Sequence, residues 1–290
     1  MAATKGVFGI YGAGSQHWVG DGFPVRNLFP SNGLEREVDP FLMLDYAGPA
    51  HFAPARRPRG VGEHPHRGFE TVTIAYQGSV AHRDSAGNSG TIEPGDVQWM
   101  TAGSGVLHEE MHAQGLTEKG GMFEMVQLWV NLPRTAKMSP PRYQSIAKGA
   151  IPSLSLGAGG QARIVAGALR GLRGPAETHT PVNVFDLRLR AGDADTLAWP
   201  ATHNAALTLL KGAVLLDGEE RLAGEARIAL LNGQPGRLSF AAEEDSTLLF
   251  LSGEPIGEPV ASHGPFVMNT QEELAQAFAD YRAGRMGRLR

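Results

Sequence analysis

Short apolar runs separated by turn-forming residues recur along the chain, and this pattern constrains the fold more than any other feature. Residues 70–76 are rich in β-branched side chains and alternate with period two, which is typical of a β-strand. Further runs of this kind lie at 97–100 and 125–130, with turn clusters at 77–78, 85–90 and 94–95. Because successive hairpins at this spacing build antiparallel sandwiches and barrels, we predict an all-β architecture.

The same pattern returns in the C-terminal half of the chain. The runs lie at 182–190, 206–210, 213–217, 226–231 and 247–252, with glycines at the expected turns (Gly212, Gly218 and Gly236). The intervening stretch, 133–160, lacks this pattern and contains two consecutive prolines and a Gly-Ala-Gly-Gly run. We interpret the second block as a degenerate copy of the first. The 290 residues then divide into an N-terminal domain (1–135), a linker region (136–165) and a C-terminal domain (166–290).

One short helix is expected close to the C-terminus. Asn269 or Thr270 can cap its first turn, and the acidic residues that follow suit the positive end of the helix dipole. Leu274, Ala277, Phe278 and Tyr281 would then share one face. We assign this helix to the C-terminal domain.

Composition excludes several classes of protein. The chain has no cysteine, which rules out disulfides, thiolate metal ligands and a cysteine nucleophile. The net charge is −4 and the basic residues are dispersed, so no direct nucleic-acid binding is expected. The first residues lack a secretory pattern, and no run approaches the roughly 18 apolar residues that span a bilayer. We expect a cytoplasmic monomer that does not enter a membrane.

Six of the ten histidines lie between positions 51 and 112. Two of them, His64 and His66, flank a proline. In an extended chain, residues two apart project to the same side, so both imidazoles can reach one metal ion. The same parity places Glu70 on that face if the strand continues unbroken. A pair of this kind is common by chance and does not establish a metal site alone.

A second motif strengthens the metal hypothesis. His108 and Glu110 repeat the two-apart spacing, whereas Glu109 between them has the wrong parity and is expected to face away. Three imidazoles and one carboxylate suit Fe(II), Mn(II), Ni(II), Cu(II) or Zn(II). Open positions on such an ion can hold water, dioxygen or a chelating substrate. His82 and His112 are expected to be ordinary strand or surface histidines, with the mouth of the cavity as the alternative.

Longer segments around these motifs resemble the pirin family of bicupins. Residues 62–72 (GEHPHRGFETV) are similar to its first metal-binding motif, and residues 95–111 (GDVQWMTAGSGVLHEEM) to its second. Further matches are 39–45 (DPFLMLD), 127–132 (QLWVNL) and 264–270 (GPFVMNT). The resemblance covers nearly the whole chain. It implies two tandem cupin barrels of the jelly-roll type, followed by the short terminal helix.

The resemblance also implies a ligand set. In pirins, the two histidines of the first motif join the histidine and the second following acid of the second motif. These positions are His64, His66, His108 and Glu110, which favours Glu110 over Glu70 as the carboxylate ligand. The second barrel has no H-x-H pair, and His203 stands alone there, so this barrel is expected to be free of metal.

Two functions of different classes follow from the resemblance. Some pirins are dioxygenases that open flavonols such as quercetin, and here Fe(II) is the expected metal, with Glu110 as the base. Phe69, Val72, Met125 and Val126 are the expected apolar walls for a small aromatic substrate. Other pirins resemble non-enzymatic, redox-responsive regulators that bind a protein partner. The sequence leaves both functions open.

Overall fold

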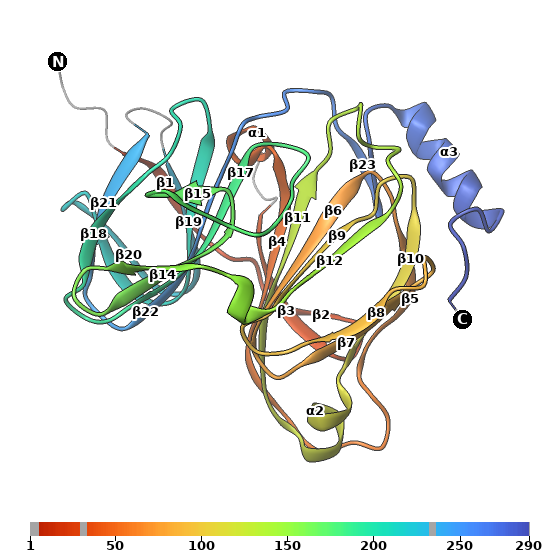
Figure 1. Cartoon of the computed structure of the whole chain (residues 1–290), viewed down its shortest axis with the longest axis horizontal. Helices are drawn as coiled ribbons and strands as arrows, with labels where there is room; N and C mark the ends of the chain where they lie inside the picture. The colour runs from red at the N-terminus through yellow and green to blue at the C-terminus, as the bar shows by residue number, and fades with distance from the viewer. Residues whose placement is uncertain (1–5, 30–33, 232–235, 290) are drawn as a thin grey trace. The chain divides into compact units, whose positions relative to one another are not determined.

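The structure is a computed structural model that describes residues 6–29, 34–231 and 236–289. Strands predominate in both halves, and the chain forms two cupin domains with a short C-terminal helix, as predicted (Figure 1). Contacts within the chain group the residues into two compact units, each built from three segments. The first unit contains residues 1–14, 28–41 and 149–255, and the second contains 15–27, 42–148 and 256–290. In the described part of the chain, no helix is long and apolar enough to cross a membrane.

The second unit carries both histidine motifs. Its larger sheet has the order β12-β9-β6-β11-β4-β3-β2, and its smaller sheet has the order β5-β10-β7-β8. The larger sheet contains β2 (His17–Val19), β3 (Phe23–Phe29), β4 (Phe41–Phe52), β6 (Phe69–Gln77), β9 (Val97–Thr101), β11 (Gly121–Asn131) and β12 (Arg142–Ile146). The smaller sheet contains β5 (Gly60–His66), β7 (Val80–Asp84), β8 (Ser89–Ile92) and β10 (Val106–His112). A short helix, α2 (Gln114–Lys119), connects β10 to β11.

The first unit is built on one nine-stranded antiparallel sheet. Its strands are β1 (Val7–Gly12), β13 (Ser153–Leu156), β14 (Gly160–Ala166), β17 (Val182–Leu189), β18 (Ala194–Ala198), β19 (Asn204–Leu216), β20 (Glu220–Leu231), β21 (Arg237–Ala242) and β22 (Ser246–Gly253). The smaller elements are α1 (Glu35–Val38), the 3-10 turn η1 (Lys148–Ala150), and the paired strands β15 (Ala168–Leu169) and β16 (Leu172–Arg173). The runs expected at 206–210 and 213–217 form a single strand. Gly212 lies inside it at a φ of 106° and does not end it.

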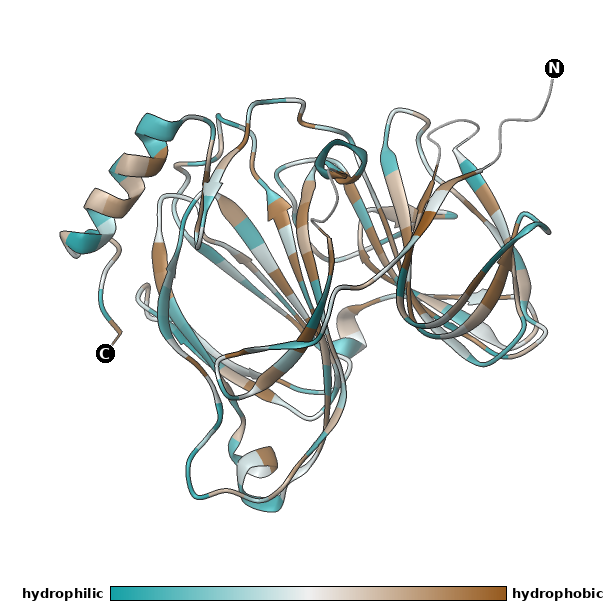
Figure 2. Ribbon diagram, turned by 180° about the vertical axis from the view of Figure 1, so that it is seen from behind, coloured by the Kyte–Doolittle hydropathy of each residue, from teal (hydrophilic) through white to brown (hydrophobic). Residues whose placement is uncertain are grey.

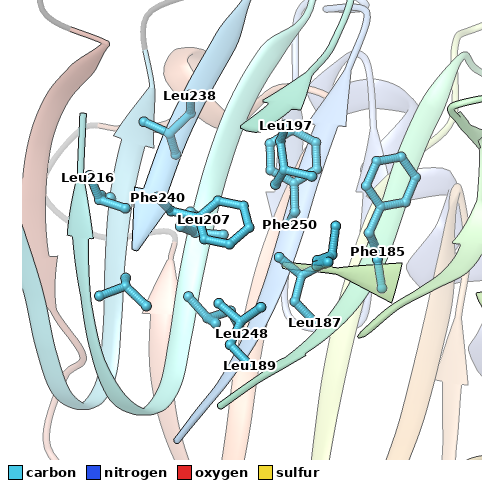
Figure 3. Close-up of a cluster of buried hydrophobic side chains, with 14 of the residues drawn as sticks. Phe185, Leu187, Leu189, Leu197, Leu207, Leu216, Leu238, Phe240, Leu248 and Phe250 are labelled. Carbon is cyan, nitrogen blue, oxygen red and sulfur yellow. The ribbon is translucent and has the colours of Figure 1, made fainter. Parts of the chain in front are cut away.

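The core of the first unit is almost entirely aliphatic and phenyl. Figure 3 shows its side chains converging between the strands, among them Phe185, Leu207, Phe240, Leu248 and Phe250. Along the strands the hydropathy changes from residue to residue, which is the pattern of sheets with one buried face (Figure 2). One buried carboxylate of the unit is paired, since Arg163 Nη1 donates to the fully buried Asp186 at 3.0 Å.

The terminal helix packs in the second unit. This helix, α3 (Gln271–Arg282), begins with a capping box in which Thr270 and Glu273 bond to each other's backbone, as its sequence suggests. Leu274 and Ala277 are buried against β24 (Phe266–Met268), which pairs with β23 (Ala261–His263). The sequence division into 1–135 and 166–290 assigns this helix to the C-terminal domain, whereas its contacts group it with residues 42–148. The apolar face of the helix packs against Leu107, Phe266 and Met268 of the second unit.

The expected linker region also has structure of its own. Residues 136–165 contain β12, η1 and β13, and most of β14. Strand β12 pairs with β9, whereas β13 and β14 pair with each other. The region therefore contributes strands to both units. Strand β12 is difficult to predict from the sequence because it is a mostly polar strand at the edge of its sheet.

Candidate metal centre

Strands β5 and β10 bring three histidines together. They pair antiparallel, with His64 directly opposite His108 and His66 opposite Val106. The ligand nitrogens of His64, His66 and His108 all lie within 4.8 Å of one another, close enough for one metal ion to bind all three. The ring centroids are 4.2 to 4.8 Å apart. The predicted H-x-H geometry and the predicted partner strand thus produce one cluster (strands labelled in Figure 1).

The three imidazoles have the protonation state that metal binding requires. Burial lowers the pKa of His64 and lowers those of His66 and His108 well below the usual histidine value, and the neighbouring imidazoles add to the shift of the last two. Neutral imidazole is the form that coordinates a metal. At neutral pH this cluster is therefore ready to bind a cation without first releasing protons from its histidines.

The hydrogen bonds of the cluster leave nitrogens available for an ion. His64 Nδ1 donates to the Gly62 carbonyl at 2.8 Å, which directs Nε2 of this ring toward a ligand position. Among the described residues, no hydrogen-bond partner reaches the buried atoms His66 Nδ1 and His108 Nε2. Buried nitrogens without a partner are costly unless a ligand satisfies them. The donor set fits a divalent transition metal.

The carboxylate of Glu110 lies near the cluster but outside the group of close ligand atoms. Its side chain is 6% exposed, and burial raises its pKa to about 7. The Thr73 hydroxyl lies 3.4 Å from Glu110 Oε1 and 2.7 Å from Gln127 Oε1. Because a hydroxyl has one proton to donate, the shorter contact to Gln127 takes it. Among the described residues, the long contact with Thr73 is thus a weak one for the Glu110 carboxylate.

Glu70 faces away from the histidines. Strand β5 ends at His66 and β6 begins at Phe69, and Gly68 between them has a φ of 87°. On β6, Thr71 lies opposite Trp129, whose ring contacts His66, so Glu70 belongs to the other face. There it accepts a hydrogen bond of 2.6 Å from Thr101. The shared parity expected for His66 and Glu70 fails because the chain does not continue as one strand through Gly68.

Two aromatic rings form a wall beside His66. Phe69 and Trp129 lie 4.1 Å apart at 33°, and each contacts the His66 ring with its edge. Of the four expected apolar wall residues, Phe69 and Met125 share this face of the sheet, whereas Val72 and Val126 lie on the opposite face. Trp129 is a further member of this wall that the sequence reasoning did not predict. Its parity with Met125 on the same strand is the signal that would have found it.

His82 and His112, which the sequence also singles out, have different surroundings. His82 lies opposite Glu110 on β7, is 6% exposed and stacks on Tyr143 with centroids 4.5 Å apart. The Tyr143 hydroxyl also contacts His82 and Gln98. His112 instead packs among phenylalanine rings and bonds to the Gly22 carbonyl at 2.9 Å, as an ordinary core histidine does. His82 and Tyr143 therefore belong to the surroundings of Glu110, and His112 does not.

His203 takes no part in this cluster. It lies in the first unit, is 7% exposed, and its Nδ1 is 3.4 Å from the Ser252 hydroxyl. The three clustered histidines all come from the second unit.

Comparisons with known proteins identify the family. A pirin family profile matches residues 22–130, and a profile for the pirin C-terminal cupin domain matches residues 184–287. This chain belongs to the pirin family. A Pseudomonas aeruginosa protein named "Putative quercetin 2,3-dioxygenase" is 52% identical over 282 residues, which is 97% of this chain and 98% of that protein. A tomato pirin-like protein is 40% identical, covering 92% of this chain and 88% of its own length.

Solved pirin structures share the whole fold. The crystal structure of a quercetin 2,3-dioxygenase from Acinetobacter baumannii is 49% identical, with a TM-score of 0.95 over 98% of this chain and 99% of that chain. A bacterial pirin from Escherichia coli, solved in complex with nickel(II), has a TM-score of 0.64 at 19% identity, over 85% of this chain and 99% of its own. At that identity the second likeness concerns the fold alone.

Proposed function

We propose that this pirin is an Fe(II)-dependent dioxygenase that opens the ring of flavonols such as quercetin. His64, His66, His108 and Glu110 would hold the metal. The observation that carries the proposal is the convergence of three neutral imidazoles, of which His66 and His108 are buried and His64 is partly buried, beside a wall of aromatic rings. The names of the Pseudomonas and Acinetobacter relatives support the same reaction.

The ligand set does not select one metal. Three histidines and a carboxylate also suit Mn(II), Ni(II), Cu(II) and Zn(II), and the supply of each ion in the cell contributes to the choice. A bound divalent metal would polarise the flavonol hydroxyl oxygen and make the chemistry of dioxygen accessible.

Glu110 is proposed as the proton acceptor in addition to its role as a ligand. Burial raises its pKa in the metal-free chain to about 7. A bound divalent cation would favour the charged form, so Glu110 would then be present as the carboxylate that accepts a proton. The carboxylate would take the hydroxyl proton from a flavonol bound at the cluster. Its weak contact with Thr73, at 3.4 Å, leaves it able to do so.

Phe69 and Trp129 are proposed to orient the substrate. A flavonol is flat and aromatic, and such a ring system packs favourably against aromatic side chains. The pair lies beside His66, so a ligand that contacts the wall is also close to the metal position. The wall and the cluster together favour a small aromatic substrate over a macromolecule.

The test is a direct assay of turnover. The chain is loaded with Fe(II) without oxygen, mixed with quercetin, and exposed to air while the flavonol absorbance is followed. Loss of the absorbance with release of carbon monoxide is the expected result. Parallel loading with Mn(II), Ni(II) and Cu(II) covers the other metals. No turnover with any of them would reject the dioxygenase and favour a redox-responsive regulator that uses the metal as a sensor.

A further inference from the structure

The residues next to two of the clustered histidines are held by the C-terminal segment 264–289 of the second unit. Arg67 directly follows His66, and Leu107 directly precedes His108. Both are buried, at 4% exposure each. Since neighbouring positions in extended chain project to opposite sides, these residues point away from the cluster when the histidines point into it. Figure 1 shows α3 alongside β10 on that outer side.

Arg67 is fixed at several points. Its Nη1 donates to Asp280 Oδ2 of α3 at 2.7 Å, and its Nε donates to the Ser104 carbonyl at 2.7 Å. The two side chains of the ion pair are only 5% and 14% exposed. Its backbone bonds to Pro265 at 3.3 Å and to Val267 at 3.0 Å. A guanidinium held in this planar arrangement fixes the chain that carries it.

Lys137 reinforces the same turn. Its buried ammonium donates to the Gly68 carbonyl at 2.9 Å, to Asn131 Oδ1 at 2.8 Å and to the Val267 carbonyl at 3.0 Å. These bonds use all three of its donors. They tie the turn that follows His66 to the C-terminal segment.

Strand β10, which carries His108, is also held by the C-terminal segment. Leu107 packs with Phe266, Leu274 and Met286 of the C-terminal segment in one apolar cluster. The Ser85 hydroxyl accepts a bond from the Leu107 amide at 3.0 Å and donates to the Met286 carbonyl at 2.7 Å. The C-terminal segment therefore contacts the neighbours of ligands on both strands.

We propose that Asp280 is a positioning residue for the metal centre, acting through Arg67 on His66. The inference rests on the metal site proposed above. Strand β5 ends at His66, so the turn that follows is held by contacts outside this strand. Several of the contacts of Arg67 are with the C-terminal segment, through Asp280 and the backbones of Pro265 and Val267. Since metal–ligand distances tolerate only a few tenths of an ångström, a shift of this turn weakens the site.

The experiment measures metal binding by the full-length chain, with Ni(II) as the probe. Asp280→Asn removes the charge that holds Arg67. Arg285→Gln is the matched control, because Arg285 bonds to the other oxygen of the same carboxylate and is exposed. We expect about a tenfold loss of Ni(II) affinity for Asp280→Asn, typical of groups that orient ligands. Arg285→Gln should bind as the wild type does.

A second readout separates positioning from general stability. The absorption spectrum of bound Co(II) reports ligand geometry, so it should change in Asp280→Asn and remain unchanged in Arg285→Gln. Asp280→Glu restores the charge and should recover most of the affinity. A loss of stability in the metal-free chain does not by itself alter the Co(II) spectrum.

Several outcomes would overturn the proposal. One is a folded Asp280→Asn chain with wild-type Ni(II) affinity and Co(II) spectrum. Another is an equal loss of affinity in Arg285→Gln. If Asp280→Asn fails to fold, Arg67→Lys is measured instead, because lysine keeps the positive charge but cannot bond through both Nε and Nη1. Unchanged Ni(II) affinity in Arg67→Lys would then reject the positioning role of Asp280. If His66→Ala still binds Ni(II) fully, the metal site itself is wrong, which is a separate failure.

Discussion

His64 lies directly opposite His108 across the β5–β10 pair, with ring centroids 4.2 Å apart. These two residues are 44 positions apart in sequence (108 − 64) and become neighbours through one antiparallel register. The same register brings in His66, two residues along the first strand. A shift by one residue would turn the histidines of one strand to the opposite face. The histidine cluster thus depends on strand pairing.

Replacing His66 by alanine should abolish stoichiometric metal binding. The variant loses one of three clustered nitrogens but retains the strand pairing, so the chain should remain folded. Metal content per chain after loading with Fe(II) or Ni(II) and desalting measures the effect, and circular dichroism checks the fold. His51→Ala is the control, because His51 is exposed and lies outside the cluster. Unchanged metal content in His66→Ala would contradict the ligand assignment.

Replacing Glu110 by glutamine should slow flavonol turnover by about 10²- to 10⁴-fold, the usual contribution of a general base. Glutamine cannot accept the substrate proton, although it fills the same space. The control is Glu109→Gln, since Glu109 is the next residue on β10 and pairs with Arg83 at 2.6 Å instead. Initial rates of quercetin loss in air measure both variants. Equal rates for Glu110→Gln and the wild type would reject the proton-acceptor role.

Replacing Trp129 by leucine should raise KM for quercetin by about three- to tenfold, because an aromatic pair contributes roughly 0.5–1.5 kcal/mol beyond its buried area. Leucine keeps an apolar, partly buried side chain but removes the partner ring of Phe69. Metal content should stay at the wild-type level, which distinguishes loss of the wall from loss of the ion. A wild-type KM would mean that the substrate does not contact this wall.

Much of the fold follows from local sequence. Alternation over residues 70–76 predicts β6, and the capping residues near Thr270 predict the start of α3, because both signals involve neighbours along the chain. The two-apart spacing likewise predicts that His64 and His66 share a face. The cluster with His108 could be proposed because each motif supplies part of one ligand set.

Long-range contacts could not be predicted in this way. The reversal of parity at Gly68 depends on a positive φ that the sequence permits but does not require. The contact between Arg67 and Asp280 joins residues 213 positions apart, and no local pattern encodes it. For the same reason, the position of α3 at the end of the sequence does not show that its apolar face packs on β24 in the second unit.

The last prediction concerns Glu70 and the pH dependence of stability. Its side chain is fully buried, and burial raises its pKa from 4.5 to about 7, against the opposing bond from Thr101. Below about pH 4.5 the carboxyl is protonated in both the folded and the unfolded chain, so it contributes no pH-dependent term. As the pH rises toward 7, the unfolded chain loses this proton first and the folded chain retains it. The free energy of unfolding therefore falls over this range, by up to about 3 kcal/mol.

Glu70→Gln should remove this loss of stability. Glutamine stays neutral and can still accept the bond from the Thr101 hydroxyl, so the variant should equal the wild type near pH 4.5 and exceed it at pH 8 by up to about 3 kcal/mol. Urea denaturation of the metal-free chain at both pH values measures the difference. Glu118→Gln is the control, since Glu118 is exposed on α2 and should show no such gain. The opposite result would contradict this prediction. If Glu70→Gln had a lower free energy of unfolding than the wild type at pH 8, the charged carboxylate would stabilise the folded chain, and burial would not be its dominant effect.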